Sequence, residues 1–168
     1  MRIHLVLVEP EIPQNTGNIA RTCAAAGLYL HLVKPLGFSI DSKAVKRSGM
    51  DYWYSVPLQV HESLDHFLDS FRGASLFFLS AKAPLPYTEI PLEDGRDIYL
   101  LFGKETAGLP RELLSANRGA CFRIPMREGT RSLNLSTSAA IVAYDLLRRR
   151  GFPGLAAPAE TQEKESFL

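Results

Sequence analysis

Three segments of the chain combine glycines with short polar or basic side chains in patterns that can bind a ligand. In residues 13–21, Asn15 and Thr16 can hydrogen-bond to the amides at a helix start, and Gly17 allows another backbone to approach closely. A helix start offers amides to an anion, and Arg21 adds a forked donor that suits phosphate. The segment therefore predicts either anion binding or a helix cap followed by an exposed arginine.

The second segment, residues 100–110, runs from an apolar stretch into a glycine, a charged pair and another glycine before a proline. Gly103 and Gly108 predict a tight loop whose backbone faces a ligand, with a purely structural turn as the alternative. The third segment, residues 124–140, leads through a basic loop into a helix start rich in Asn, Ser and Thr. One residue suffices to cap a helix, so this richness predicts ligand contact as well as capping.

Several well-known site patterns are absent from the sequence. No two glycines are separated by a single residue, so the GxGxxG dinucleotide fingerprint does not occur. Gly103 and Gly108 have P-loop spacing, but Leu109 and Pro110 stand where that loop needs Lys and Ser or Thr. There is also no GxSxG nucleophile elbow. These absences argue against a nicotinamide-dependent enzyme, an ordinary Rossmann methyltransferase and a P-loop ATPase.

The cysteines and histidines form no metal-binding pattern. Cys23 and Cys121 lie far apart, in no CxxC pair and with no histidine at ligand spacing, which disfavours both a zinc site and a disulfide scaffold. His4 and His31 fall within predicted strands, where we favour structural roles. We therefore expect no metal.

The three segments need a scaffold, and the hydrophobic pattern predicts one. It predicts strands over residues 3–8, 29–33, 75–80, 98–102 and 121–124, and an extended stretch over 52–60. It predicts helices over residues 16–26, 43–49, 62–71, 110–116 and 135–149. Thr16 is the expected N-cap of the first helix, and Gly27 its expected end. Strands alternating with helices predict an α/β fold, a mostly parallel sheet flanked by helices. Each of the three segments then follows a strand, at the edge where ligands of such sheets usually bind.

Length and composition are those of an ordinary globular domain: 168 residues, 46% of them hydrophobic and 22% charged. No apolar run approaches the roughly 18 residues that span a bilayer. The first six residues read as a strand rather than a signal peptide, so no membrane association and a cytoplasmic location are expected. Residues 1–155 are predicted to form one domain, and 156–168 a flexible acidic tail.

Charge is distributed unevenly, although the net charge is only +1. Residues 104–131 hold six basic and three acidic residues, and residues 43–47 hold three further basic ones. Such local patches can follow a phosphate backbone without a basic protein overall, although each is also compatible with a merely solvated surface. Tyr52, Trp53 and Tyr54 could stack on bases, or belong to a half-buried strand.

The order and spacing of these motifs resemble a known family. The chain resembles the SPOUT class of S-adenosylmethionine-dependent RNA methyltransferases. The motifs that match are residues 9–21, 35–38, 49–52, 102–110, 124–126 and 132–136. The resemblance is closest to the YibK-like (TrmL) tRNA wobble-nucleotide 2′-O-methyltransferases. It covers nearly everything from residue 3 to residue 155, and leaves out the acidic tail. It implies a C-terminal trefoil knot, which rules of chain topology alone would reject, and a homodimer.

The resemblance also implies roles for individual residues. S-adenosylmethionine would be held in the knot, mainly by backbone groups, at Leu79, Gly103, Ile124, Ser132 and Leu133. Arg21, Asn15 and Tyr144 would be catalytic, with Tyr144 at the dimer interface near the substrate; as a bare residue, Tyr144 is more typical of a core. Because arginine keeps its proton, we interpret Arg21 as holding a neighbouring phosphate and polarising the 2′-hydroxyl.

Three polar residues near the predicted site keep two interpretations each. Glu105 either holds its loop or accepts a hydrogen bond from the substrate. Asn134 and Ser136 either cap the last helix or contact the reacting ribose, and capping is favoured for Ser136.

The resemblance implies that the partner is the anticodon stem-loop of tRNA, which fits the rule that single-stranded loops are the usual targets of sequence-specific RNA recognition. The wobble nucleotide would be cytidine or a modified uridine, at position 34. Two alternatives remain at this point: a related enzyme acting on another tRNA or rRNA ribose, and a non-catalytic module that binds RNA or a ligand.

Overall fold

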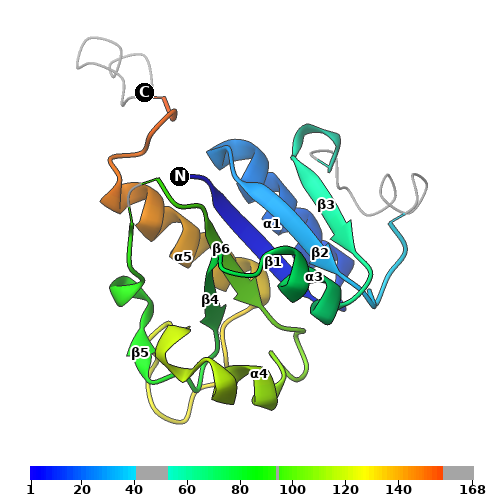
Figure 1. The fold of residues 1–168 in the computed structure, drawn as a ribbon, viewed down its shortest axis with the longest axis vertical. Helices are drawn as coiled ribbons and strands as arrows, with labels where there is room; N and C mark the ends of the chain where they lie inside the picture. The colour runs from blue at the N-terminus through cyan, green and yellow to red at the C-terminus, as the bar shows by residue number, and fades with distance from the viewer. Residues whose placement is uncertain (41–52, 94, 157–168) are drawn as a thin grey trace, which may run out of the picture.

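Seven parallel strands form the central sheet of the computed structural model, which describes residues 1–40, 53–93 and 95–156 (Figure 1). The strands are β1 (Ile3–Val8), β2 (Tyr29–Val33), β3 (Leu58–His61), β4 (Ser75–Leu79), β5 (Leu85–Pro86), β6 (Ile98–Phe102) and β7 (Cys121–Arg123). Their order across the sheet is β3-β2-β1-β6-β4-β7-β5, and each neighbouring pair is parallel. The predicted α/β class is confirmed. The trefoil knot stays a prediction.

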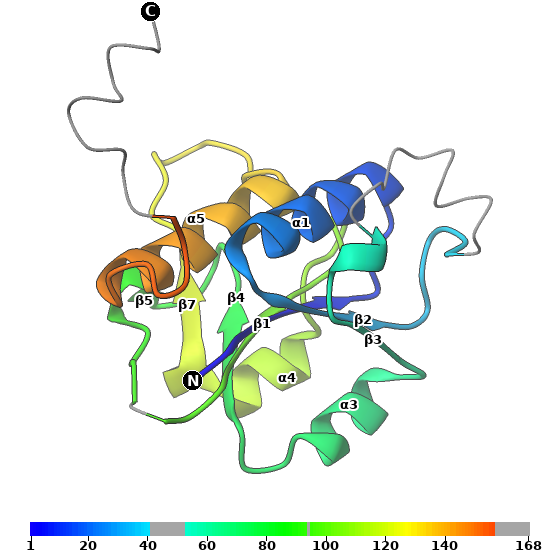
Figure 2. The ribbon, with the colours of Figure 1, turned by 90° about the horizontal axis from the view of Figure 1, so that it is seen from above.

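Helices cover both faces of the sheet (Figure 2). α1 (Pro13–Ala26) and α5 (Leu135–Arg149) pack side by side on one face, and α3 (Leu64–Ser70) and α4 (Arg111–Ala116) lie on the other. Short 3₁₀ turns, η1 (Trp53–Ser55), η2 (Tyr87–Glu89) and η3 (Arg118–Ala120), connect the larger elements. Successive residues of β1 alternate between the two layers: Leu5 and Leu7 face α1 and α5, while Val6 and Val8 face α3 and α4.

The predicted first helix begins too late. α1 starts at Pro13 rather than Thr16, because proline lacks the amide that a helix start leaves unpaired and its backbone angle already suits the helix. Thr16 is therefore inside the helix and fully buried, and its hydroxyl has no hydrogen-bond partner, so the prediction of Thr16 as N-cap was wrong. The end at Gly27 is confirmed: its left-handed backbone, φ 65°, closes the helix.

Elsewhere the sequence pattern predicted long elements better than short ones. The strands 3–8, 29–33 and 98–102 and the helix 135–149 have the predicted bounds. Within the stretch predicted to be extended, Trp53 instead lies in η1 and only residues 58–61 form a strand. β5, η2 and η3 were not predicted. Three predicted features lie outside the described residues: the helix 43–49, the residues 49–52 of the family motif and the tail beyond Ala156. The assignment of residues 1–155 to a domain and of 156–168 to a tail therefore stays a prediction.

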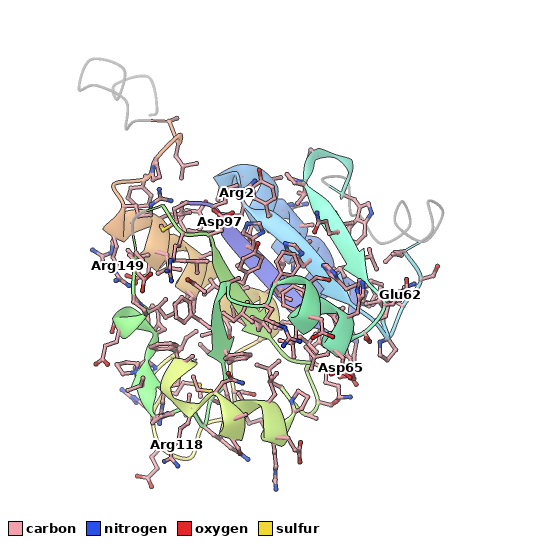
Figure 3. The ribbon with its side chains drawn as sticks, viewed as in Figure 1. Arg2, Glu62, Asp65, Asp97, Arg118 and Arg149 are labelled. Atoms are coloured by element: carbon pink, nitrogen blue, oxygen red, sulfur yellow. The ribbon has the colours of Figure 1, made fainter. Side chains whose placement is uncertain are left out.

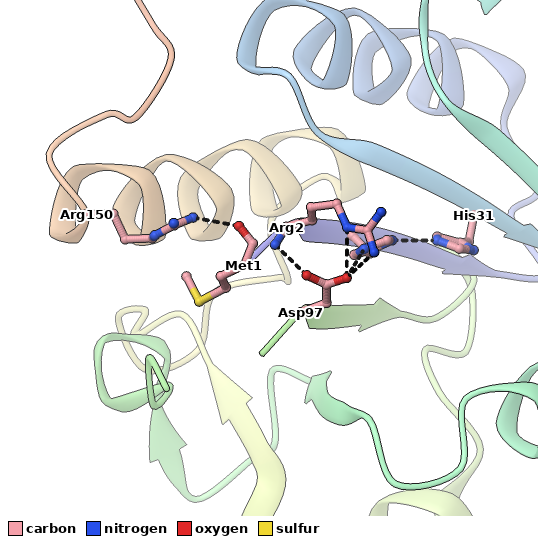
Figure 4. A network of polar contacts seen from close by, with 6 residues as sticks. Met1, Arg2, His31, Asp97 and Arg150 are labelled. Carbon is pink, nitrogen blue, oxygen red and sulfur yellow. Dashed lines mark hydrogen bonds and ion pairs between the residues drawn. The ribbon is translucent and has the colours of Figure 1, made fainter. Parts of the chain in front are cut away.

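Three histidines form a hydrogen-bonded chain through the buried layer beneath α3. His31 Nε2 lies 2.9 Å from His4 Nδ1, and His31 Nδ1 lies 2.9 Å from His61 Nε2. At the amino edge of the sheet, His4 Nε2 faces the carboxylate of Asp97 at 3.6 Å, and Asp97 is held by Arg2 (Figures 3 and 4). A neutral imidazole donates one hydrogen bond and accepts one, so this geometry suits uncharged histidines. It agrees with the structural roles favoured for His4 and His31.

The row of three buried histidines predicts that acid destabilises the protein. Burial lowers the pKa of all three imidazoles, and that of His31 to about 3, with His4 and His61 contributing. In the unfolded chain, histidines take up protons near pH 6.5, so stability is present above that pH and is lost as the pH falls below it. Between pH 7.5 and pH 5, His31 alone is expected to remove about 2 kcal/mol from the free energy of unfolding.

Urea unfolding at a series of pH values measures this loss. The non-titrating His31→Gln variant should show a correspondingly smaller fall. A His31→Gln protein with the full wild-type pH dependence would contradict the assignment.

Candidate functional site

A cavity of about 950 Å³ lies at the carboxyl ends of β4, β6 and β7. Its walls are the residues that follow β4 (79–82), the loop after β6 (102–109) and the segment that leads from β7 into α5 (122–135). Ile12 and Asn15, at the start of α1, complete it. A cavity at this edge, of this size, is the usual ligand site of an open α/β sheet. All three segments selected from the sequence thus meet at one place.

The predicted site residues divide into two groups. The residues expected to bind cofactor all line the cavity, as does Asn15; these are Leu79, Gly103, Ile124, Ser132 and Leu133. Arg21 and Tyr144 do not line it. Both are exposed, on the outward sides of α1 and α5. Lys82 also lines the cavity but lay outside the segments selected from the sequence, although its position just after a strand could have indicated it.

The loop after β6 is closed by its own backbone. A side-chain carbon on Gly103 would lie 2.0 Å from the carbonyl carbon of Gly108, so only glycine fits there. Gly108 has a left-handed φ of 72°, and its amide donates to the carbonyl of Lys104 at 2.8 Å. The tight loop predicted from the two glycines is confirmed. It presents peptide groups to the cavity as a fixed wall.

Glu105 fixes this loop to the start of α1. Its carboxylate accepts hydrogen bonds from the amides of Glu11 at 2.8 Å and Ile12 at 3.3 Å, and from the side-chain amide of Asn15 at 2.8 Å. A carboxylate is also favoured there by the positive end of the helix dipole. Of the two interpretations of Glu105, holding the loop is therefore the one that the geometry supports.

The same network continues to the start of α5. Asn15 Oδ1 accepts from Asn134 Nδ2 at 2.9 Å, and Asn134 Oδ1 in turn accepts from the amides of Ser136 at 2.8 Å and Thr137 at 3.3 Å. Asn134 is thus the N-cap of α5, and the expectation that Ser136 caps the helix was wrong, because Ser136 lies inside its first turn. Asn15, 5% exposed, joins both helix starts.

Positive charge surrounds the cavity. Lys82, Arg111, Arg123 and Arg127 contribute to its lining and make no ion pair with any described residue. Lys104 differs, since its ammonium group lies 2.8 Å from Glu9, a hydrogen bond that raises the pKa of the lysine. These four cations come from three different segments of the chain. They are well placed to attract an anionic ligand to this edge of the sheet.

Other kinds of chemistry find little support in the described residues. Cys23 and Cys121 are buried and free, and burial raises the pKa of both thiols, so neither is an activated nucleophile. Within residues 1–40, 53–93 and 95–156, no cluster of three or more His, Cys, Asp or Glu side chains could hold a metal ion. The same residues contain no helix long and apolar enough to cross a membrane.

Comparison with known proteins identifies the family. The SpoU rRNA Methylase family model matches residues 2–144, most of the chain. The chain belongs to the SpoU rRNA methylase family. A relative from Geobacillus stearothermophilus, whose name describes a tRNA (cytidine(34)-2′-O)-methyltransferase, is 48% identical over 156 residues, which cover 92% of this chain and 99% of that protein.

Solved structures agree with the SpoU assignment. One that is described as giving structural insights into the 2-OH methylation of C/U34 on tRNA has a TM-score of 0.81 and 45% identity, and the match covers 89% of this chain and 97% of that one. The AdoMet-bound rRNA methyltransferase from Sinorhizobium meliloti has a TM-score of 0.76 and 27% identity, over 88% of this chain and 56% of that one. The expected SPOUT-type methyltransferase fold is therefore confirmed.

Proposed function

We propose that this protein transfers a methyl group from S-adenosylmethionine to the 2′-hydroxyl of the wobble ribose, position 34, of a tRNA. The observation that carries the proposal is the 45% identity, over almost the whole of both chains, to the structure described for methylation of C/U34 on tRNA. The name of the Geobacillus stearothermophilus relative supports the same reaction. The geometry of the cavity adds support from the chain itself.

The cavity fits S-adenosylmethionine. Leu79 and Ile124 are partly buried beside it, and Leu133 is 40% exposed although it is a large apolar side chain. A flat adenine ring would cover such surface, while peptide groups of the loops at Gly103 and Ser132 can read its polar edge. When bound, S-adenosylmethionine supplies an electrophilic methyl group; the protein supplies position and electric field.

We assign Arg21 to the acceptor ribose. Its guanidinium stays charged, so it cannot remove the proton of the 2′-hydroxyl; it can hold the adjacent phosphate and polarise the hydroxyl. Correct positioning of two reacting groups lowers a barrier by as much as roughly 7–11 kcal/mol. Asn15 connects the helix that carries Arg21 to the cavity wall, through Glu105 and Asn134.

We propose further that the active form is a homodimer. Arg21 and Tyr144 lie outside the cavity of their own chain, so a role at the reaction requires that they reach the cavity of a second copy. Tyr144, on α5, is 41% exposed, and Phe152, just after α5, is 42% exposed; both are large apolar side chains that an interface would cover. Sedimentation of the purified protein tests the assembly.

The tRNA partner, we propose, is bound through its anticodon stem-loop. The unpaired Lys82, Arg111, Arg123 and Arg127 beside the cavity suit a phosphate backbone, and this contact should weaken as salt rises.

Nucleoside mass spectrometry of tRNA from a strain that lacks the gene tests the proposal. The 2′-O-methyl group at position 34 should be absent from at least one tRNA and should return with the wild-type gene. Loss of a ribose methyl group at another tRNA position or in rRNA would favour a related SpoU reaction instead. A strain with unchanged tRNA and rRNA methylation would contradict the proposal and favour a non-catalytic module.

A further inference from the structure

Two loops at the cavity are joined by hydrogen bonds in which each loop provides one carboxylate acceptor. The Glu105 side chain of the loop after β6 accepts from the amide of Glu11 at 2.8 Å. The Glu11 side chain of the loop before α1 accepts in return from Thr106, whose amide and hydroxyl both lie 3.0 Å away. We call this reciprocal set of hydrogen bonds among Glu11, Glu105 and Thr106 the clasp.

Glu11 differs from its partners in the clasp because it does not line the cavity, whereas Thr106 and Glu105 do. The hydrogen bonds of the Glu11 side chain lead to the cavity through Thr106, which lines it. Besides the clasp, the tip of this loop is held by the bonds of Glu105 to Ile12 and Asn15, by the neighbouring Lys104–Glu9 pair and, among the described residues, by the bridge between Lys104 and Gly108. Residues 105 and 106 thus depend on contacts with the loop before α1 and with the first turn of α1, and Thr106 is held from there by the Glu11 side chain.

The backbone of Glu11 is itself supported from behind. The amide of Gly37 donates to the carbonyl of Pro10 at 2.9 Å. A side-chain carbon on Gly37 would lie only 2.7 Å from the Cα of Glu11, so the two segments are in close contact. Glu9, two residues before Glu11, binds the ammonium group of Lys104 at 2.8 Å. The backbone of Glu11 is therefore firmly supported, and its side chain reaches across to Thr106 at the less supported tip of the loop after β6.

We propose that Glu11 is a positioning residue for the cofactor cavity: through Thr106, it holds residues 103–108 in the conformation that binds S-adenosylmethionine. The inference rests on the proposed function and adds to it a residue outside the cavity. In Glu11→Gln, one carboxylate oxygen becomes an NH₂ group, which cannot accept from Thr106. The Thr106 amide then keeps one oxygen acceptor, while the Thr106 hydroxyl loses its charged acceptor and has to accept from the NH₂ group instead. Both hydrogen bonds become neutral ones, so the loop is held less firmly.

Isothermal titration with S-adenosylhomocysteine, the demethylated product, tests the proposal without catalysis. Glu11→Gln should weaken the binding by roughly tenfold, the scale of a lost hydrogen bond to a charged group. In kinetics, the KM for S-adenosylmethionine should rise by the same factor, with kcat changed by less than about threefold. Glu62→Gln is the control for the same chemical change, since Glu62 is an exposed carboxylate that pairs with Lys34 and does not line the cavity, and it should keep wild-type affinity.

Variants of Thr106 complete the test. Thr106→Val should weaken binding, Thr106→Ser should restore it, and Glu11→Gln combined with Thr106→Val should lose no more than the worse single variant. Wild-type affinity in both Glu11→Gln and Thr106→Val, or additive losses in the double variant, would overturn the role of the clasp. A wild-type protein that does not bind S-adenosylhomocysteine or S-adenosylmethionine would instead overturn the proposed function. If Glu11→Gln does not fold, the comparison of Thr106→Val with Thr106→Ser decides.

Discussion

Replacement of Arg21 by alanine is expected to reduce the rate of methyl transfer by about a thousandfold, the upper range for removal of one group that stabilises developing charge. The affinity for S-adenosylmethionine should stay within about twofold of wild type, because Arg21 does not line the cavity of its own chain. Single-turnover methylation of tRNA measures the rate, and calorimetry measures the affinity. Arg72→Ala is a suitable control, since Arg72 is exposed and pairs with Asp69 on the far side of the sheet.

Two results would refute this assignment of Arg21. One is a loss of cofactor affinity that accounts for the lost rate, since Arg21 would then support the cavity rather than the acceptor. The other is near-normal transfer by Arg21→Ala. A mixed dimer extends the test: Arg21→Ala combined with a cofactor-binding variant should regain part of the activity only if Arg21 acts in the cavity of the other subunit.

Gly103→Ala is expected to abolish cofactor binding, with a loss of affinity of a hundredfold or more. The added carbon would lie 2.0 Å from the carbonyl carbon of Gly108 and 2.1 Å from the amide nitrogen of Leu109, both backbone atoms that cannot rotate away. The loop must open, and overpacking of this kind costs about 1–3 kcal/mol of stability. Calorimetry with S-adenosylhomocysteine, together with thermal unfolding, measures both effects.

Gly119→Ala is the matched control for Gly103→Ala. A side-chain carbon there meets no atom within 4 Å, so the same chemical change should leave both affinity and folding intact. Wild-type affinity in Gly103→Ala would show that the loop adapts, and that its closed form is not needed for binding.

The sequence predicted the fold best where local signals and burial agree. The last helix has the predicted bounds because Asn134 caps its start and the chain turns at Gly151, with a left-handed φ of 71°. The first helix was misplaced because Thr16 resembles a cap, whereas Pro13 had already begun the helix and Thr16 became part of the core. Trp53 was assigned to an extended stretch, and instead lies buried in a 3₁₀ turn that packs on α1.

The candidate site was predictable in its backbone and much less so in its side-chain contacts. Gly103 and Gly108 after an apolar strand indicated the tight loop, since few other patterns require two glycines there. The partners of Glu105 could not be predicted from nearby residues, because they lie 90 to 94 positions away. The histidine chain was equally hidden, since strand order alone decides that β1, β2 and β3 are neighbours.

The central claim concerns which atom of which nucleotide receives the methyl group. Purified protein should be incubated with tRNA and S-adenosylmethionine carrying a deuterated methyl group, and the product digested and mapped by mass spectrometry. We predict one labelled methyl group per modified tRNA, on the ribose of nucleotide 34. Label on a base, label on another nucleotide, or tRNA that stays unlabelled while the protein binds the donor would contradict the account.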